Sequence, residues 1–152
     1  MKKLLFTFML AMLGMAIMAQ TTAVTKQTAT VSKDYYTYKY IGNTAVDTLG
    51  AVRDSIVYPI YVESPNPTYY DFKIRLHELV SACNINVKLQ AKKFISDDWA
   101  DVASRAYKGA GTDTSILFTQ VSTLQHYNYY QIILIRSANK ARLTDLTAVF
   151  KR

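Results

Sequence analysis

A short acidic stretch contains the residues with the most evident chemical potential. It reads "SDDWADV" and places Asp97, Asp98 and Asp101 around Trp99, the only tryptophan of the chain. Carboxylate oxygens are preferred Ca²⁺ ligands. However, the glycine and distal glutamate of an EF-hand calcium loop are missing. Aspartate and serine side chains that hydrogen-bond their own backbone also explain the pattern, and we favour this β-turn interpretation.

Trp99 has two interpretations of its own. An exposed indole offers sugars a flat apolar stacking surface with a polar edge. Alternatively, Trp99 opens a strand and fills the core between two sheets. The largest apolar side chain gains most from burial, so the sequence favours the core.

Other catalytic or metal-binding patterns are weak. His77 and His126 stand apart, without the cysteines or carboxylates that complete a zinc site. The chain has no Gly-x-Ser-x-Gly nucleophile motif. Its single cysteine, Cys83, excludes an intrachain disulfide and sits among apolar neighbours, which predicts a buried thiol. We therefore expect a protein that is not an enzyme, with no cofactor and no metal.

Tyrosine is unusually abundant, with twelve residues, several of them adjacent to one another. In a strand, neighbouring side chains point to opposite faces, so each adjacent pair places one ring inward and one outward. Outward tyrosines are suited to recognition, whereas tyrosine is also simply a good strand former. Both interpretations stay open. The candidate ligand-binding residues are Trp99, Tyr129, Tyr130, Tyr69, Tyr36, Lys92 and Lys93.

The charge is moderately basic. The net charge of the whole chain is +7, and it falls to +5 if Lys2 and Lys3 leave with a leader peptide. Such a balance favours anionic surfaces without indicating a nucleic-acid partner, since no RNA- or DNA-binding motif accompanies it. Five basic residues could form one face beside the tyrosines: Lys88, Lys92, Lys93, Arg105 and Lys108.

Period-two alternation of apolar and polar residues runs through most of the chain and predicts strands. It places Tyr70, Phe72, Ile74 and Leu76 on one buried face. Pro59 predicts an edge or bulged strand, and the apolar run 127–137 predicts a central one. A short helix is considered only within 76–84. We expect an all-β fold, an antiparallel β-sandwich of immunoglobulin-like or jelly-roll-like type with seven to nine strands.

The beginning of the chain has the pattern of a secretory signal peptide. Two lysines precede an apolar run that ends in small residues, and cleavage after Ala19 would leave Gln20 first. The run is shorter than the roughly 20 residues of a bilayer span. We expect a signal peptide over 1–19, an extended arm over 20–33 and one sandwich domain over 34–152. The predicted location is the periplasm, the cell surface or the extracellular space.

Residues 85–150 carry a resemblance. The stretches "VKLQAKKFISDDWADV", "GAGTDTSILF" and "HYNYYQIILIRS" resemble small β-sandwich modules of bacteriophage virion and tail proteins and of exported Bacteroidetes-type proteins. The resemblance implies an adhesive, decorative or assembly role. The predicted function is adhesion, assembly or glycan binding, with a cell-surface glycan or further copies of the chain as partners. The alternative is a structural capsid- or tail-associated protein of a phage or prophage particle, located in the virion.

Overall fold

The computed structural model describes residues 20–22, 35–62, 69–109, 114–121 and 127–151. Their regular secondary structure consists of strands throughout, because alternating β-branched and aromatic residues suit a pleated, half-buried surface. Two strands have only two residues each: β1 (Gln20–Thr21) and β3 (Thr48–Leu49). The other eight strands are longer: β2 (Tyr35–Ile41), β4 (Ser55–Tyr61), β5 (Tyr69–Glu78), β6 (Asn84–Lys92), β7 (Ala100–Lys108), β8 (Thr114–Val121), β9 (Tyr129–Ala138) and β10 (Ala141–Lys151).

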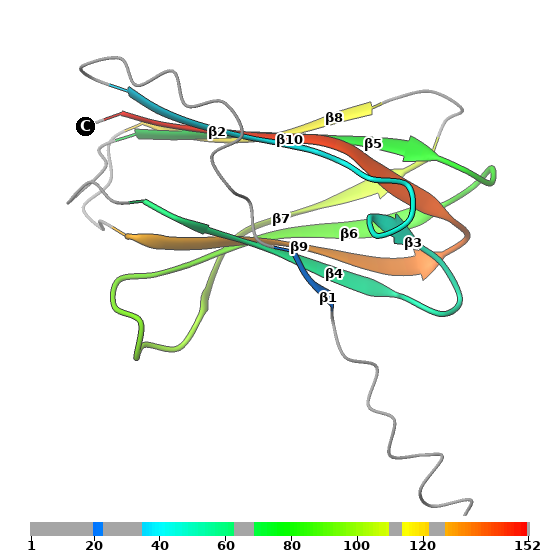
Figure 1. Ribbon diagram of the computed structural model, residues 1–152, viewed down its shortest axis with the longest axis horizontal. Coiled ribbons are helices and arrows are strands. Elements are labelled where there is room, and N and C mark those ends of the chain that lie inside the picture. The colour runs from blue at the N-terminus through cyan, green and yellow to red at the C-terminus, as the bar shows by residue number, and fades with distance from the viewer. Residues whose placement is uncertain (1–19, 23–34, 63–68, 110–113, 122–126, 152) are drawn as a thin grey trace, which may run out of the picture.

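The strands form two sheets packed face to face (Figure 1). One sheet has the order β1-β4-β9-β6-β7 and is called the β9 sheet here. The other has the order β2-β10-β5-β8, with β3 beside β10, and is called the β10 sheet. When only the eight long strands are counted in chain order, β2-β10-β5-β8 are strands 1-8-3-6. By the same count, β4-β9-β6-β7 are strands 2-7-4-5. This is the order of a jelly roll, so the predicted all-β antiparallel sandwich is confirmed.

The core between the sheets is built by strict alternation. Along β5 the buried residues are those predicted, Tyr70, Phe72, Ile74 and Leu76. The adjacent tyrosines also divide as expected: Tyr36, Tyr70 and Tyr130 are buried, while Tyr35, Tyr69 and Tyr129 lie on the outer faces. Cys83 is buried too, as its apolar neighbours predict.

Two positional predictions are confirmed. Strand β9 lies between β4 and β6, which explains why it is apolar on both faces. Pro59 of β4 lies near an edge of its sheet. Only β1 lies outside β4, and the pairing between β1 and β4 ends at Val57. The amide of Thr22 donates to the Val57 carbonyl at 2.7 Å. Backbone groups two residues apart point to the same side, so the missing amide of Pro59 faces the outer edge.

The region 76–84 does not contain the helix that was considered. It ends β5, turns and begins β6, with Ala82 at a φ of 60°. The side-chain amide of Asn139 donates to the carbonyls of Ser81 and Ala82 at 2.9 and 3.2 Å. These bonds satisfy turn carbonyls that a helix would have used internally.

Several predictions concern residues outside the described ranges. These are the signal peptide at 1–19, most of the arm at 20–33, and His126. Within the described part of the chain, the arm contributes the edge strand β1. No helix in the described residues is long and apolar enough to cross a membrane.

Candidate functional site

A row of aromatic residues crosses the outer face of the β9 sheet at one end. The strand register aligns Tyr61 of β4 with Tyr129 of β9, and Tyr129 with Lys92 of β6. The rings of Tyr61 and Tyr129 lie 4.9 Å apart between centroids. The Lys92 ammonium lies 5.9 Å from the Tyr129 ring centroid and 4.9 Å from that of Trp99. We call Tyr61, Tyr129, Lys92 and Trp99 the aromatic row.

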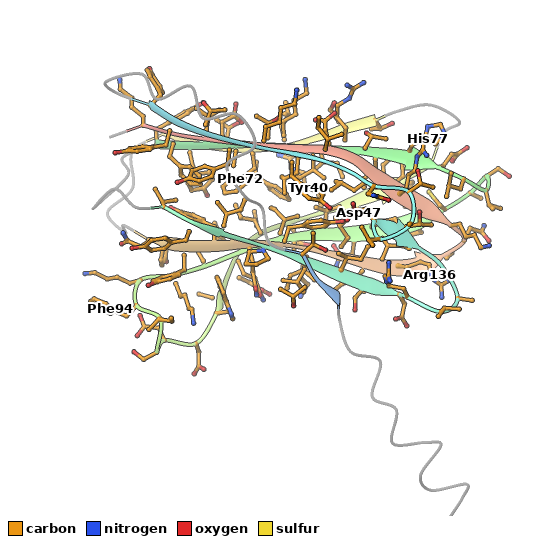
Figure 2. All side chains as sticks on the ribbon, in the orientation of Figure 1. Tyr40, Asp47, Phe72, His77, Phe94 and Arg136 are labelled. Atoms are coloured by element: carbon orange, nitrogen blue, oxygen red, sulfur yellow. The ribbon has the colours of Figure 1, made fainter. Side chains whose placement is uncertain are left out.

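Lys92 also orders the loop that connects β6 to β7. Its ammonium donates to the backbone carbonyls of Ile95 and Asp97, at 2.5 and 3.2 Å. Within the loop, the Asp97 amide donates to the Phe94 carbonyl at 3.1 Å, and the Asp97 carboxylate accepts from the Phe94 amide at 3.0 Å. The predicted turn, in which an acid bonds its own backbone, is therefore confirmed for Asp97. The loop leaves Phe94 59% exposed and Ile95 74% exposed, and Figure 2 shows Phe94 at the margin of the molecule.

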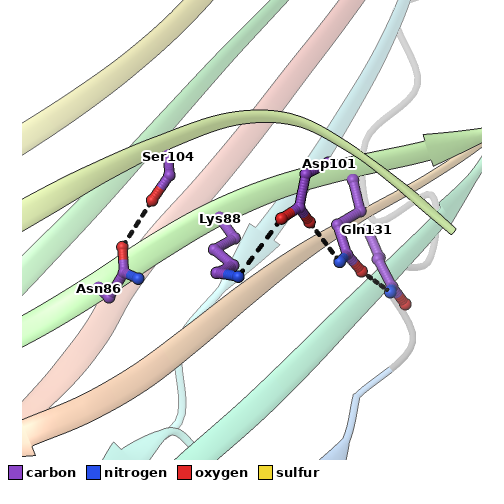
Figure 3. Close-up of polar contacts among 6 residues, drawn as sticks. Asn86, Lys88, Asp101, Ser104 and Gln131 are labelled. Carbon is purple, nitrogen blue, oxygen red and sulfur yellow. Dashed lines mark hydrogen bonds and ion pairs between the residues drawn. The ribbon is translucent and has the colours of Figure 1, made fainter.

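A second row, two residues further along the same strands, is polar. The side-chain amide of Gln131 donates to Gln90 at 2.5 Å, and that of Gln90 donates to the Asp101 carboxylate at 2.6 Å (Figure 3). The Lys88 ammonium approaches the other oxygen of Asp101 at 3.4 Å. We call Gln131, Gln90, Asp101 and Lys88 the polar row. Residues two apart in a strand share a face and lie about 7 Å apart, so the two rows are neighbours.

The hydrogen bonds of the polar row run from Gln131 through Gln90 to Asp101, so they end on a carboxylate. The hydrogen bond from Gln90, helped by the positive charge of Lys88, lowers the pKa of Asp101 below its ordinary value. Asp101 stays ionised at neutral pH and acts as an acceptor, while the two glutamines offer both donors and acceptors. Further along the face, the Ser104 hydroxyl donates to Asn86 at 2.7 Å. The outer face of the β9 sheet thus combines rings with ordered amide and carboxylate groups.

Of the seven predicted site residues, four lie in or next to the aromatic row, one lies on the opposite sheet and two are buried. Trp99, Tyr129 and Lys92 are brought together in the aromatic row, and Lys93 lies beside them, with its ammonium 5.4 Å from the Phe94 ring. Tyr69 lies on the outer face of the β10 sheet, away from that group.

Two of the predicted residues are corrected by their burial. Tyr36 and Tyr130 are buried in the core, so their rings do not reach a surface ligand. The physical reason is the alternation itself, which turns the second member of each pair inward. The preference for Trp99 as a core residue is also wrong. It is only partly buried and stands outside the core cluster, because the loop places it against Lys92. Asp101 belongs to β7 rather than to the tip of the turn.

The sequence reasoning missed Tyr61, Gln90 and Gln131. Alternation along β4 could have marked Tyr61 as outward, because Tyr58 and Ile60 are both buried. The two glutamines carry no such signal. Their pairing depends on the register between β6 and β9, which long-range packing decides. Among the described residues, no three His, Cys, Asp or Glu side chains are grouped closely enough to hold a metal ion.

Comparisons with known proteins found similarity at the level of structure. No protein-family model matches the chain, and no curated protein matches its sequence. A structure titled "CBM4 structure and function" matches with a TM-score of 0.44 and 13% identity, over 83% of this chain and 76% of the other. The Eiger TNF of S. frugiperda matches with a TM-score of 0.46 and 9% identity, over 78% and 93%.

Viral proteins are also among the matches. A chain in the structure of the infectious bursal disease virus Gx strain matches with a TM-score of 0.48 and 14% identity, over 76% of this chain and 32% of the other. Tailspike protein 4 of bacteriophage CBA120 gives 0.38 and 11%, over 76% and 15%. The chain therefore resembles β-sandwich domains of several kinds, and no sequence family accompanies the resemblance. Likeness of this degree is confined to the shape of the sandwich and does not indicate a ligand.

Proposed function

We propose that this protein is a non-enzymatic glycan-binding domain of an exported protein, and that the outer face of the β9 sheet is its binding surface. The observation that carries the proposal is the adjacency of the aromatic row and the polar row on one face. Export rests on the leader pattern of residues 1–19.

The chemistry of the two rows matches that of a sugar. A pyranose ring has an apolar face of C–H groups and a rim of hydroxyls that both donate and accept hydrogen bonds. Tyr61, 50% exposed, and the rings of Tyr129 and Trp99 offer apolar contact area at low entropic cost. The Gln90 amide and the Asp101 carboxylate can exchange hydrogen bonds with hydroxyls, while Gln131, which is buried, orients Gln90.

The surface is also held in place before a ligand arrives. Lys92 is bonded to two loop carbonyls and lies over two rings, so the loop, Trp99 and Tyr129 share one anchor. Amide–amide and amide–carboxylate bonds similarly order the polar row. Preorganised groups lose little conformational entropy on binding, which favours affinity for a ligand with few contacts of its own.

The test is a binding screen with matched variants. We expect the purified protein to bind at least one polysaccharide in affinity electrophoresis or on a glycan array. Tyr129→Ala and Trp99→Ala should each weaken binding about tenfold or more, since each removes a central ring. Tyr129→Phe should retain most of the affinity, because the ring remains.

Tyr35→Ala provides the control, since Tyr35 is an exposed tyrosine on the opposite sheet, beside Lys151. Its binding should equal that of the unchanged protein. Far-UV circular dichroism checks that every variant is folded. The proposal fails if the unchanged protein binds no glycan, or if Tyr35→Ala weakens binding as much as Tyr129→Ala does.

A further inference from the structure

The outer edges of the two sheets differ in how they are protected. An edge strand presents unpaired amide and carbonyl groups, and natural proteins shield such edges with charges, prolines, bulges or short extra strands. In the described part of the chain, the β10 sheet ends at β2 and β8, and the β9 sheet ends at β1, beside β4, and at β7.

Three of these four edges carry protection. Strand β4 has Pro59 and is partly covered by β1. Strand β7 contains Asp101, Arg105 and Lys108, and its register with β6 shifts at a bulge between Leu89 and Gln90. Strand β2 carries Lys39, an exposed lysine, in its middle. Each feature opposes the addition of another strand.

Within the described residues, strand β8 lacks every one of these features. Its eight residues, "TSILFTQV", include no charge and no proline, and its register with β5 is unbroken. Ile116 and Phe118 point into the core, whereas Leu117 is 48% exposed on the outer face. We propose that β8 pairs antiparallel with β8 of a second copy of this chain, which joins two β10 sheets into one continuous sheet.

The sequence of β8 is compatible with its own antiparallel pairing about a two-fold axis at Leu117. Leu117 then faces Leu117 of the second copy on the outer side, and Ile116 faces Phe118 on the core side. Ser115 faces Thr119, another pair of like character. Side chains that are directly opposite point to the same face, so this register keeps the core faces continuous and buries the two exposed leucines together.

Strand β8 itself carries none of the like charges that would keep two copies of a basic chain apart at this edge. The chain is basic, with a net charge of +7, and any charge within β8 would meet its own copy near the axis. The strand has none. In β5, Arg75 lies beside Ser115 and Asp71 beside Thr119. The two rows that flank the axis therefore run from Arg75 of one copy to Asp71 of the other. Three strand spacings, about 14 Å, separate these charges across the contact, and the same holds for the central Lys73 pair, so beyond a Debye length they contribute little to it. Arg75 is also already paired with Asp145 of β10 at 3.4 Å. The resulting contact is isologous.

The first test is sedimentation analysis of the purified protein over a concentration series. We expect a reversible monomer–dimer equilibrium. Leu117→Lys should raise the dissociation constant at least tenfold, because it places two lysines opposite each other on the axis. Ile41→Lys is the matched control, because Ile41 is 61% exposed at the end of β2, the other edge of the same sheet. The dissociation constant of the Ile41→Lys dimer should equal that of the unchanged protein.

The second test does not depend on weakening the fold. Opposite residues in an antiparallel pair have Cβ atoms about 5 Å apart, so Leu117→Cys should form an intermolecular disulfide under mild oxidation. Ile41→Cys should not, and the buried Cys83 should keep the unchanged protein monomeric on a non-reducing gel. A protein that stays monomeric at all concentrations overturns the proposal. So does equal cross-linking at positions 41 and 117, or equal loss of dimer in both lysine variants.

Discussion

At the scale of single residues, Asp47, in the connection between β2 and β4, is held by several contacts at once. It is fully buried, yet it accepts hydrogen bonds from the hydroxyls of Tyr40 and Tyr58, at 2.7 and 2.8 Å, and from the Asn43 amide at 2.6 Å. A buried carboxylate is costly unless several donors meet it, and these three donors provide that compensation. Asp47 therefore holds the connection to the end of the sandwich.

We expect Asp47→Ala to lower the free energy of unfolding by about 3 kcal/mol, because it leaves two buried hydroxyls and an amide without their acceptor. Urea denaturation measures the change. Asp98→Ala removes an exposed acid from the β6–β7 loop and should change stability by less than about 0.5 kcal/mol. Similar losses in the two variants would show that overall charge, rather than the buried contacts, matters.

At the scale of elements, β10 organises its sheet by pairing with β2, β3 and β5. Its register with β5 shifts between Leu143 and Asp145, and the chain leaving β2 runs close alongside it there. The Gly42 amide donates to the Thr144 carbonyl at 2.9 Å. A Cβ atom at Gly42 would lie only 1.9 Å from the Leu143 carbonyl oxygen. This close approach is possible because residue 42 has no side chain.

Gly42→Ala should therefore destabilise the protein by about 2 kcal/mol or more, since backbone must move to admit the methyl group. Gly50→Ala is a suitable comparison, because the nearest atoms to its Cβ are those of the flexible Lys140 side chain, at 3.7 Å. That variant should be nearly neutral or slightly stabilising. Thermal unfolding of both variants measures the difference, and equal melting temperatures would contradict the close backbone approach at Gly42.

At the scale of the whole molecule, rings from both sheets meet across the core. Tyr130 of β9 lies 5.6 Å from Phe72 of β5 and 5.1 Å from Phe150 of β10, measured between ring centroids. Near the Asp47 connection, Tyr40 of one sheet lies 5.6 Å from Tyr58 of the other. Burial, together with Asp47, raises the pKa of Tyr40 and Tyr58. The contact between the sheets thus includes phenols that must stay protonated.

This predicts a loss of stability at alkaline pH. An unfolded tyrosine releases its proton near pH 10, whereas folded Tyr40 and Tyr58 retain theirs to higher pH. Their contribution is complete below pH 10 and declines as the pH rises above it, because the unfolded state then binds fewer protons than the folded state. The slope of unfolding free energy against pH above 10 should be smaller in Tyr40→Phe than in the unchanged protein. A slope unaffected by Tyr40→Phe would refute the assignment.

Much of this architecture could be predicted from local pattern. Alternation correctly identified the buried face of β5, the division of each tyrosine pair and the central place of β9. Alternation could not decide whether the Trp99 side chain is buried or exposed, because Trp99 follows a loop and the path of that loop sets its burial. Residue type alone makes Tyr36 and Tyr130 candidates, although the same alternation that predicts their strands turns them inward.

The sequence by itself determined the strand segments, their inward faces and the class of fold, because period two and turn residues are local properties of the chain. Only the tertiary structure decided which residues meet: Tyr61 with Tyr129, Lys92 with Trp99, and Gln131 with Gln90 and Asp101. These contacts join strands far apart in the sequence, and their register follows from the packing of the whole core.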